Sequence, residues 1–111
     1  MVRLFGNAIA ASGSETSEVI SGVGMDGYFS LQVQITGDGT AKFEVLSSNN
    51  GVDFLDINSD ILASQTKSTG PGSDGKNMAS FTLVPSMAFK IKVTETGGAQ
   101  GITPTAWLKV F

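Results

Sequence analysis

The chain has 111 residues, a net charge of -3, and neither cysteine nor histidine. Its seven basic residues are scattered, so it lacks the concentrated positive surface that nucleic-acid phosphates require. Without those two residue types, disulfides, thiolate catalysis, Ser-His-Asp triads and His- or Cys-based zinc sites are excluded. No segment approaches the roughly 20 apolar residues of a membrane span, so no membrane partner is expected.

Length and composition predict one domain over residues 1–111, because a chain of this size buries about 65% of its unfolded surface. Only 15% of the residues are charged and 14 are glycine, which favours an all-β fold. We expect a single antiparallel β-sandwich or small jelly roll of seven to eight strands.

The N-terminal segment predicts a first strand over residues 2–11 with apolar side chains on both faces. Such a strand lies inside a doubly covered sheet or against another subunit. Residues 12–17 are polar and turn-like, and residues 18–21 predict a short strand.

The clearest pattern flanks Gly37-Asp38-Gly39, where apolar residues occupy alternate positions over 29–35 and 41–45. This period of two predicts two half-buried strands whose apolar sides share one dry interior. We interpret them as a hairpin with a three-residue loop and Gly39 in the left-handed conformation. Apolar residues then face each other: Ile35 with Ala41, Val33 with Phe43, and Leu31 with Val45. A two-residue Asp38-Gly39 turn would oppose apolar and charged residues, because a one-residue slip exchanges the faces.

The next segment opens with a turn at 47–51, followed by predicted strands at 52–57, anchored by Phe54, and at 60–63. It also holds four oxygen donors, the side chains of Asp53, Asp56, Asn58 and Asp60. Calcium prefers such ligands, but their order does not match an EF-hand loop. Asx turns at a strand end explain them better, so no metal site is expected.

Catalysis by paired carboxylates is equally weakly supported. A glycosidase needs two carboxylates across a cleft, whereas Asp53 and Asp56 would point to opposite faces of a strand. We expect no catalytic residues, no cofactor and no enzymatic activity.

A long exposed loop is predicted at 65–77, which has no large apolar residue. A second alternating pair follows at 78–84 and 87–94, connected at Pro85-Ser86, and would place Phe81 opposite Phe89. The segment 95–101 is glycine-rich but precedes no helix, so it indicates a turn rather than a phosphate loop. The last strand covers 103–111, with Ala106, Leu108 and Val110 inward.

Four aromatic side chains are candidates for exposed interface anchors: Phe5, Tyr28, Trp107 and Phe111. Such rings anchor subunit contacts, and in some sandwich domains they form platforms for sugars. The alternative is that some of them close the core.

Several segments between residues 17 and 111 resemble small β-sandwich proteins encoded among the virion structural genes of tailed phages and prophages. The likeness rests on the Ser30-Leu31-Gln32-Val33 strand, Thr-Gly-x-Gly at 36–39 and Ser-x-x-Gly-x-x-Phe at 48–54. It continues in Lys-Val-Thr-Glu-Thr-Gly-Gly at 92–98 and in the closing Thr103-Pro104-Thr105-Ala106-Trp107-Leu108 strand. Pro104 removes one ladder bond, which predicts an edge or a bulge at the start of that strand.

The resemblance implies a non-enzymatic virion component made in the host cytoplasm, above all a capsid decoration or cement protein. Its partners would be capsid or other virion proteins, and a homo-oligomer is expected. A tail or baseplate accessory domain and a carbohydrate-binding module that uses Trp107 or Tyr28 are the alternatives.

Overall fold

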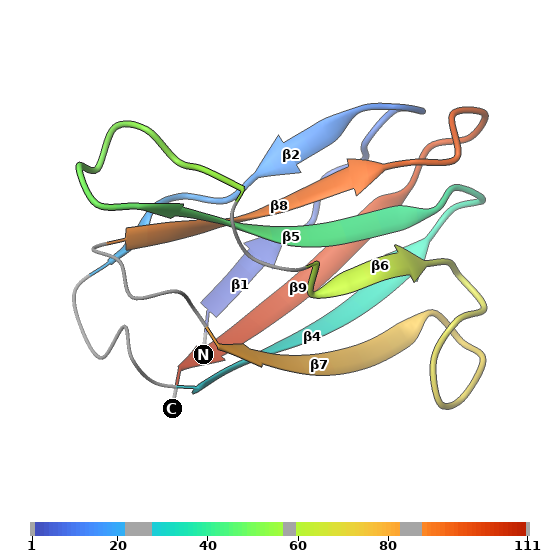
Figure 1. Ribbon diagram of the computed structural model, residues 1–111. Helices are drawn as coiled ribbons and strands as arrows, with labels where there is room; N and C mark the ends of the chain where they lie inside the picture. Colours follow the sequence, from blue (N-terminus) through green and yellow to red (C-terminus); the bar gives the residue numbers. More distant parts are fainter. Residues whose placement is uncertain (1, 22–27, 57–59, 83–87, 111) are drawn as a thin grey trace.

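The computed structural model describes residues 2–21, 28–56, 60–82 and 88–110. Within these ranges nine strands form two antiparallel sheets (Figure 1). The first sheet has the order β1-β9-β4-β7, and the second has the order β2-β8-β5-β6 with β3 also on β8. The strands are β1 Val2–Phe5, β2 Ser14–Thr16, β3 Ile20–Ser21, β4 Tyr28–Thr36, β5 Ala41–Ser48, β6 Leu62–Gln65, β7 Lys76–Thr82, β8 Ala88–Glu95 and β9 Thr103–Val110.

The strand order is that of a jelly roll. β2 and β3 pair with successive parts of β8, so together they form one interrupted edge. With that edge counted once, each sheet has four strand positions, in the interleaved order of two Greek keys. The expected all-β sandwich is confirmed.

One dry interior lies between the sheets, and alternation along the strands determines which side chains enter it. Positions 29, 31, 33 and 35 of β4 and 41, 43 and 45 of β5 are buried, as the sequence predicts. β8 contributes Phe89, Ile91 and Val93, and β9 contributes Ala106 and Leu108. The shared interior is therefore confirmed.

The pairing predicted between the two central strands is wrong. β4 pairs with β7 and β9, whereas β5 pairs with β6 and β8, so the chain crosses from one sheet to the other at 37–40. Val33 and Phe43 therefore enter the same interior from opposite sheets and are not partners in a ladder. The left-handed residue is Gly37, with a φ of 90°, and not Gly39. Gly39 is required for space instead, because a Cβ there would lie 2.5 Å from the Gln100 carbonyl oxygen.

The same error affects the second predicted pair, because β7 and β8 also belong to different sheets. Phe81 and Phe89 both contact Phe29 instead. The Phe29 ring stacks on Phe81 with centroids 5.4 Å apart and meets Phe89 edge-on at 5.1 Å. Phe29 thus links a neighbour in its own sheet to one in the opposite sheet. The connection at Pro85-Ser86 lies outside the described residues.

Several strand limits differ from expectation. The first strand ends at Phe5 and only an isolated bridge follows, between Ile9 and Ile102. Residues 14–16, expected to be a turn, form β2 because they pair with Thr94 to Lys92. The strand predicted at 52–57 is absent from its described part, 52–56, apart from one bridge between Leu55 and Ser47.

Pro104 lies where the ladder on its β1 side is interrupted. The amide and carbonyl of Ile102 both bond to Ile9, on the β1 side. The backbone groups of position 104, two residues further on, point to this same side. The segment that faces Pro104 on the β1 side lies between Phe5 and Ile9 and belongs to no strand. The missing N–H of proline therefore costs no ladder bond, as expected for a bulge or edge.

The carboxylate of Glu95 joins three loops at one end of the sandwich. Its two oxygens accept four backbone N–H groups: Ser12 at 3.0 Å, Thr40 at 2.9 Å, and Gly97 and Gly98 at 2.7 Å each. The residue is only 1% exposed. These bonds, led by the one from Ser12, lower the pKa of Glu95 to about 2.

Replacing Phe29 with alanine should destabilise the fold by about 3–5 kcal/mol, because the ring fills the interior between the sheets. Urea unfolding would measure the change. Val52→Ala is the matched control: Val52 is 79% exposed, and its truncation should change stability by less than about 0.5 kcal/mol. Equal effects of the two substitutions would contradict the assigned interior.

Glu95 should make stability fall in acid. A carboxyl whose pKa is lowered by folding stabilises the protein above its ordinary pKa of 4.5, and this contribution is lost as the pH falls toward about 2. Glu95→Gln should unfold at lower urea concentration at neutral pH and show a weaker acid dependence in that window. A variant with the wild-type acid profile would show that Glu95 does not carry this linkage.

Candidate functional site

The outer faces of the two sheets differ in how far they are covered. Residues 54 and 55 contact the second sheet in two ways, through a ring over its outer face and through a backbone bridge at its edge. The Lys90 ammonium of β8 sits 4.3 Å from the centre of the Phe54 ring, and Leu55 and Ser47 exchange two backbone hydrogen bonds of 2.8 Å. The Phe54 ring therefore covers part of that outer face, whereas Leu55 extends the sheet beside β5.

The same outer face carries the buried carboxyl group of Glu44, on the outward side of β5. Glu44 is 6% exposed. Burial raises its pKa, the neighbouring Asp56 carboxyl raises it further, and Lys42 and Lys92 act in the opposite direction. Lys42 lies 3.9 Å from Glu44 and 3.6 Å from Asp60, so it joins the acidic groups of β5 and the following loop.

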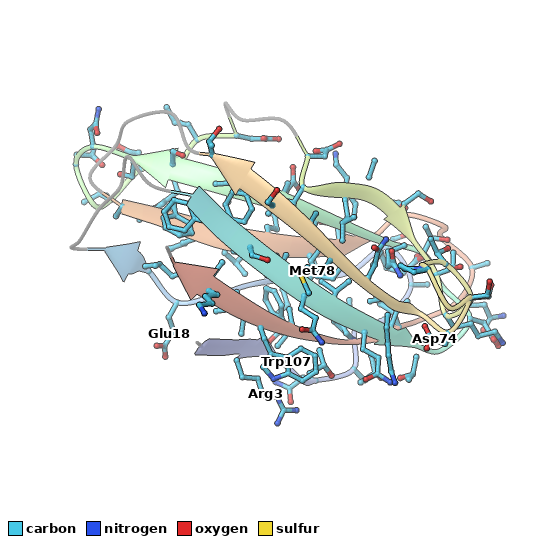
Figure 2. The ribbon with its side chains drawn as sticks, turned by 90° about the horizontal axis from the view of Figure 1, so that it is seen from below. Arg3, Glu18, Asp74, Met78 and Trp107 are labelled. Atoms are coloured by element: carbon cyan, nitrogen blue, oxygen red, sulfur yellow. The ribbon has the colours of Figure 1, made fainter. Side chains whose placement is uncertain are left out.

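The outer face of the first sheet carries a row of side chains that come from four different strands. The register between these strands places them side by side. Arg3 is opposite Trp107, Trp107 is opposite Gln32, and Gln32 is opposite Met78. Figure 2 shows Arg3 beside Trp107, with Met78 further across the same face. Met78 is 60% exposed, Arg3 and Gln32 are exposed, and Trp107 is half-buried. We call the surface centred on these four residues the open face.

The loop predicted at 65–77 is shorter than expected, and side-chain hydrogen bonds hold it. Gln65 belongs to β6 and Lys76 begins β7, so the connection is 66–75. Gln65 is fully buried: its side-chain amide donates to the carbonyls of Thr69, at 2.9 Å, and Gly75, at 3.2 Å. It also accepts from the Asn77 amide at 3.1 Å. The prediction that position 65 is exposed is wrong, because Gln65 supplies the polar centre around which the loop folds.

This loop forms the wall of a groove of about 280 Å³ beside the open face. Gln32 and Met78 belong to its floor, and Pro71 and Asp74 to the loop. Figure 2 shows Asp74 at the loop end of the molecule, beyond Met78. Because Gln65 holds the loop, the groove exists before any partner binds, which reduces the ordering cost of association.

Of the four predicted interface aromatics, only Trp107 has the expected position within the described residues. Phe5 is 3% exposed and its ring lies 6.4 Å from that of Phe43, so its assignment as an exposed anchor is wrong. The register of β1 shifts between Arg3 and Phe5, and this bulge turns Phe5 into the core. The side chain of Tyr28 and the whole of Phe111 lie outside the described residues.

Sequence reasoning missed Met78, Gln32 and Arg3. A signal existed for Met78, because alternation turns its side chain outward when Ala79 and Phe81 point inward. The alternation gave no sign that Met78 and Trp107 belong to the same face, because their strands are separated by β4.

The oxygen donors considered for calcium do not assemble into a site within the described part of the chain. No three His, Cys, Asp or Glu side chains there come together so as to hold a metal ion. Asp53 accepts a hydrogen bond from Asn50, as in a local turn, and Asn58 lies outside the described residues. Nor do the described residues include a helix long and apolar enough to cross a membrane.

Comparison with known proteins shows that the fold of this chain is similar to that of several solved structures. No protein-family model matches the chain, and no curated protein matches it. Among solved structures, it is similar to PliG of Aeromonas hydrophila, a periplasmic inhibitor of g-type lysozyme, with 15% identity and a TM-score of 0.52. That match covers 99% of this chain and 85% of the other.

Two further structures extend the comparison. The carbohydrate-binding module CBM36, solved with calcium and xylotriose, has 14% identity and a TM-score of 0.50, over 94% of this chain and 78% of the module. A protein of the T13 IBDV viral particle has 9% identity and a TM-score of 0.49, over 96% of this chain and 30% of the other. At these identities the first two matches show a shared sandwich fold and no more.

Glu44→Gln should stabilise the protein at neutral pH. A carboxyl with a raised pKa favours folding while it is protonated, and that contribution is lost as the pH rises above 4.5 through the folded-state value. The neutral amide removes this loss, so the gain should shrink in acid. Urea unfolding across this range would test it, with exposed Glu18→Gln as control. A gain independent of pH would contradict the mechanism.

Proposed function

We propose that this protein is a non-enzymatic structural component of a phage virion, a capsid decoration protein that acts through protein-protein contacts. The observation that carries the proposal is the open face, where Trp107 and Met78 are displayed on a rigid sheet. Aromatic rings, methionine and arginine are the side chains enriched in protein interfaces, and here an arginine flanks the aromatic ring. The outer face of the second sheet is partly covered by Phe54 and holds the buried Glu44, so the first sheet is the docking surface in this proposal.

Two further lines of support are independent of that face. The strand and turn patterns resemble virion structural proteins of tailed phages, and the jelly-roll order is common among viral capsid and lectin domains. The sequence also lacks the histidine and cysteine on which most hydrolytic and metal-dependent sites depend. In this proposal the protein is made in the host cytoplasm and its partners are shell proteins of the virion.

Particles purified from the source of this chain would test the proposal by cryo-electron microscopy. The expected result is density for the sandwich on the outer capsid surface, with the open face toward the shell. Density on the tail or baseplate would replace this proposal by an accessory role there. Absence of the chain from the particle would overturn a virion role.

Rebinding to particles stripped of the protein would test the face itself. Trp107→Ala should weaken binding by about 2 kcal/mol or more, roughly thirty-fold in affinity, because a central aromatic anchor is lost. Val52→Ala changes an exposed apolar residue elsewhere and should bind as the wild type does. Co-sedimentation measures both, and equal binding by the two variants would contradict docking through Trp107.

A carbohydrate-binding module is the second candidate, favoured by the half-exposed Trp107 near a groove that contains the Asp74 carboxylate and the Gln32 amide. The similar module CBM36 was solved with xylotriose. Because the chain has a single tryptophan, xylotriose and other neutral oligosaccharides can be titrated against its fluorescence. Saturable change with xylotriose that is lost in Asp74→Ala would favour this candidate over docking to a shell protein.

A further inference from the structure

The charged side chains of this protein are divided unequally between the two sheets. The four strands of the first sheet contain three basic residues, Arg3 in β1, Lys76 in β7 and Lys109 in β9, and no Asp or Glu. The other segments contain all ten carboxylate residues and only four basic ones, in a chain whose net charge is -3. The strands of the first sheet are therefore the cationic part of an anionic chain.

Alternation places all three basic residues on the outer side of the first sheet, within or beside the open face. Arg3 is directly opposite Trp107, and Lys109 lies two residues further along β9, on the same side as Trp107. Lys76 lies two residues before Met78 in β7, and on the same side of that strand. All three basic side chains are exposed. Trp107 and Met78 thus each have a cation next to them, along or across the strands.

Two of these cations, Arg3 and Lys76, form no ion pair with any carboxylate of the described residues, whereas Lys42 and Lys67 elsewhere in the chain do. Arg3 donates from Nε to a backbone carbonyl at 3.4 Å, which holds the guanidinium without neutralising it. Asp74 borders the open face at its loop end, and it accepts the backbone amide of Lys76 at 3.2 Å. That bond does not involve the Lys76 ammonium group. The positive charge of the open face is therefore available to a partner.

A surface of this kind fits an acidic protein better than other anions. Aromatic rings and methionine are enriched in protein interfaces, and complementary charges around them increase the rate and the specificity of association. Nucleic acid fits less well, because its binding depends on many phosphate contacts and this face offers three cations around two large side chains of low polarity. Carboxylates arranged around an apolar site would match both the charge and the centre of the open face.

We propose that the partner of the open face is an acidic protein surface, whose Asp and Glu side chains surround an apolar site for Trp107 and Met78. Its carboxylates then face the three cations that flank these two side chains. Such a surface attracts the first sheet and repels the parts of the chain that carry the carboxylates, so it orients the protein before contact. This inference rests on the docking function proposed above and adds to it the chemistry of the partner.

Rebinding to stripped particles over a range of sodium chloride concentrations would test this chemistry. The affinity of the wild type should fall as salt is added, because salt screens exposed charges. Arg3→Glu and Lys76→Glu should each weaken binding by about tenfold or more at low salt, because like charges then face each other, and the loss should shrink at high salt. Lys90→Glu makes the same change of charge on the outer side of the second sheet and should bind as the wild type does.

The outcomes separate this inference from the docking function on which it rests. If Trp107→Ala abolishes binding while salt, Arg3→Glu and Lys76→Glu have no effect, docking through the open face is correct and the acidic partner is wrong. If the wild type binds no stripped particles at any salt concentration, both are wrong. Heparin, a polyanion without an apolar site, should bind only weakly. Binding to heparin as tight as to particles, dependent on both cations but not on Trp107, would overturn the acidic protein in favour of a polyanion.

Discussion

The carboxylate of Glu95 holds together one end of the sandwich. This is the end at which residues 37–40 connect β4 to β5. Backbone amides from the turns before β2, before β5 and after β8 all donate to its two oxygens. Backbone amides that are withdrawn from water need acceptors. A single ionised group therefore satisfies several donors together and ties together the ends of β2, β5 and β8 in the second sheet. A neutral side chain could accept fewer such bonds, and each would be weaker.

Alternation in the sequence was sufficient to predict which apolar side chains of β4, β5, β8 and β9 are buried, because the direction of a side chain along a regular strand is a local property. It could not show which strands are partners. Val33 and Phe43 would both point into the interior whether their strands were paired in one sheet or faced each other across two. The apolar pattern is the same in both arrangements, so hairpins were inferred where the chain crosses between sheets.

The open face shows the same division between local and long-range information. Trp107 was identified because it lies opposite the inward Ala106 and Leu108, whereas its neighbours Gln32 and Met78 depend on the alignment of three strands. Phe5 was misplaced because a bulge shifts its register, which no periodic pattern reveals. Gln65 and Glu95 were missed for a related reason: their partners are polar backbone groups of loops, and loops have no period.

The interleaved strand order has a consequence for how this chain reaches its structure. β5 and β6 are the one pair of successive strands bonded to each other in the described residues. Every other ladder joins segments distant in sequence, so distant parts of the chain must meet before either sheet can grow. Such a topology folds slowly and as a single cooperative unit. A fragment that ended before β9 would lack the strand between β1 and β4, so an incomplete chain could not retain half of the domain.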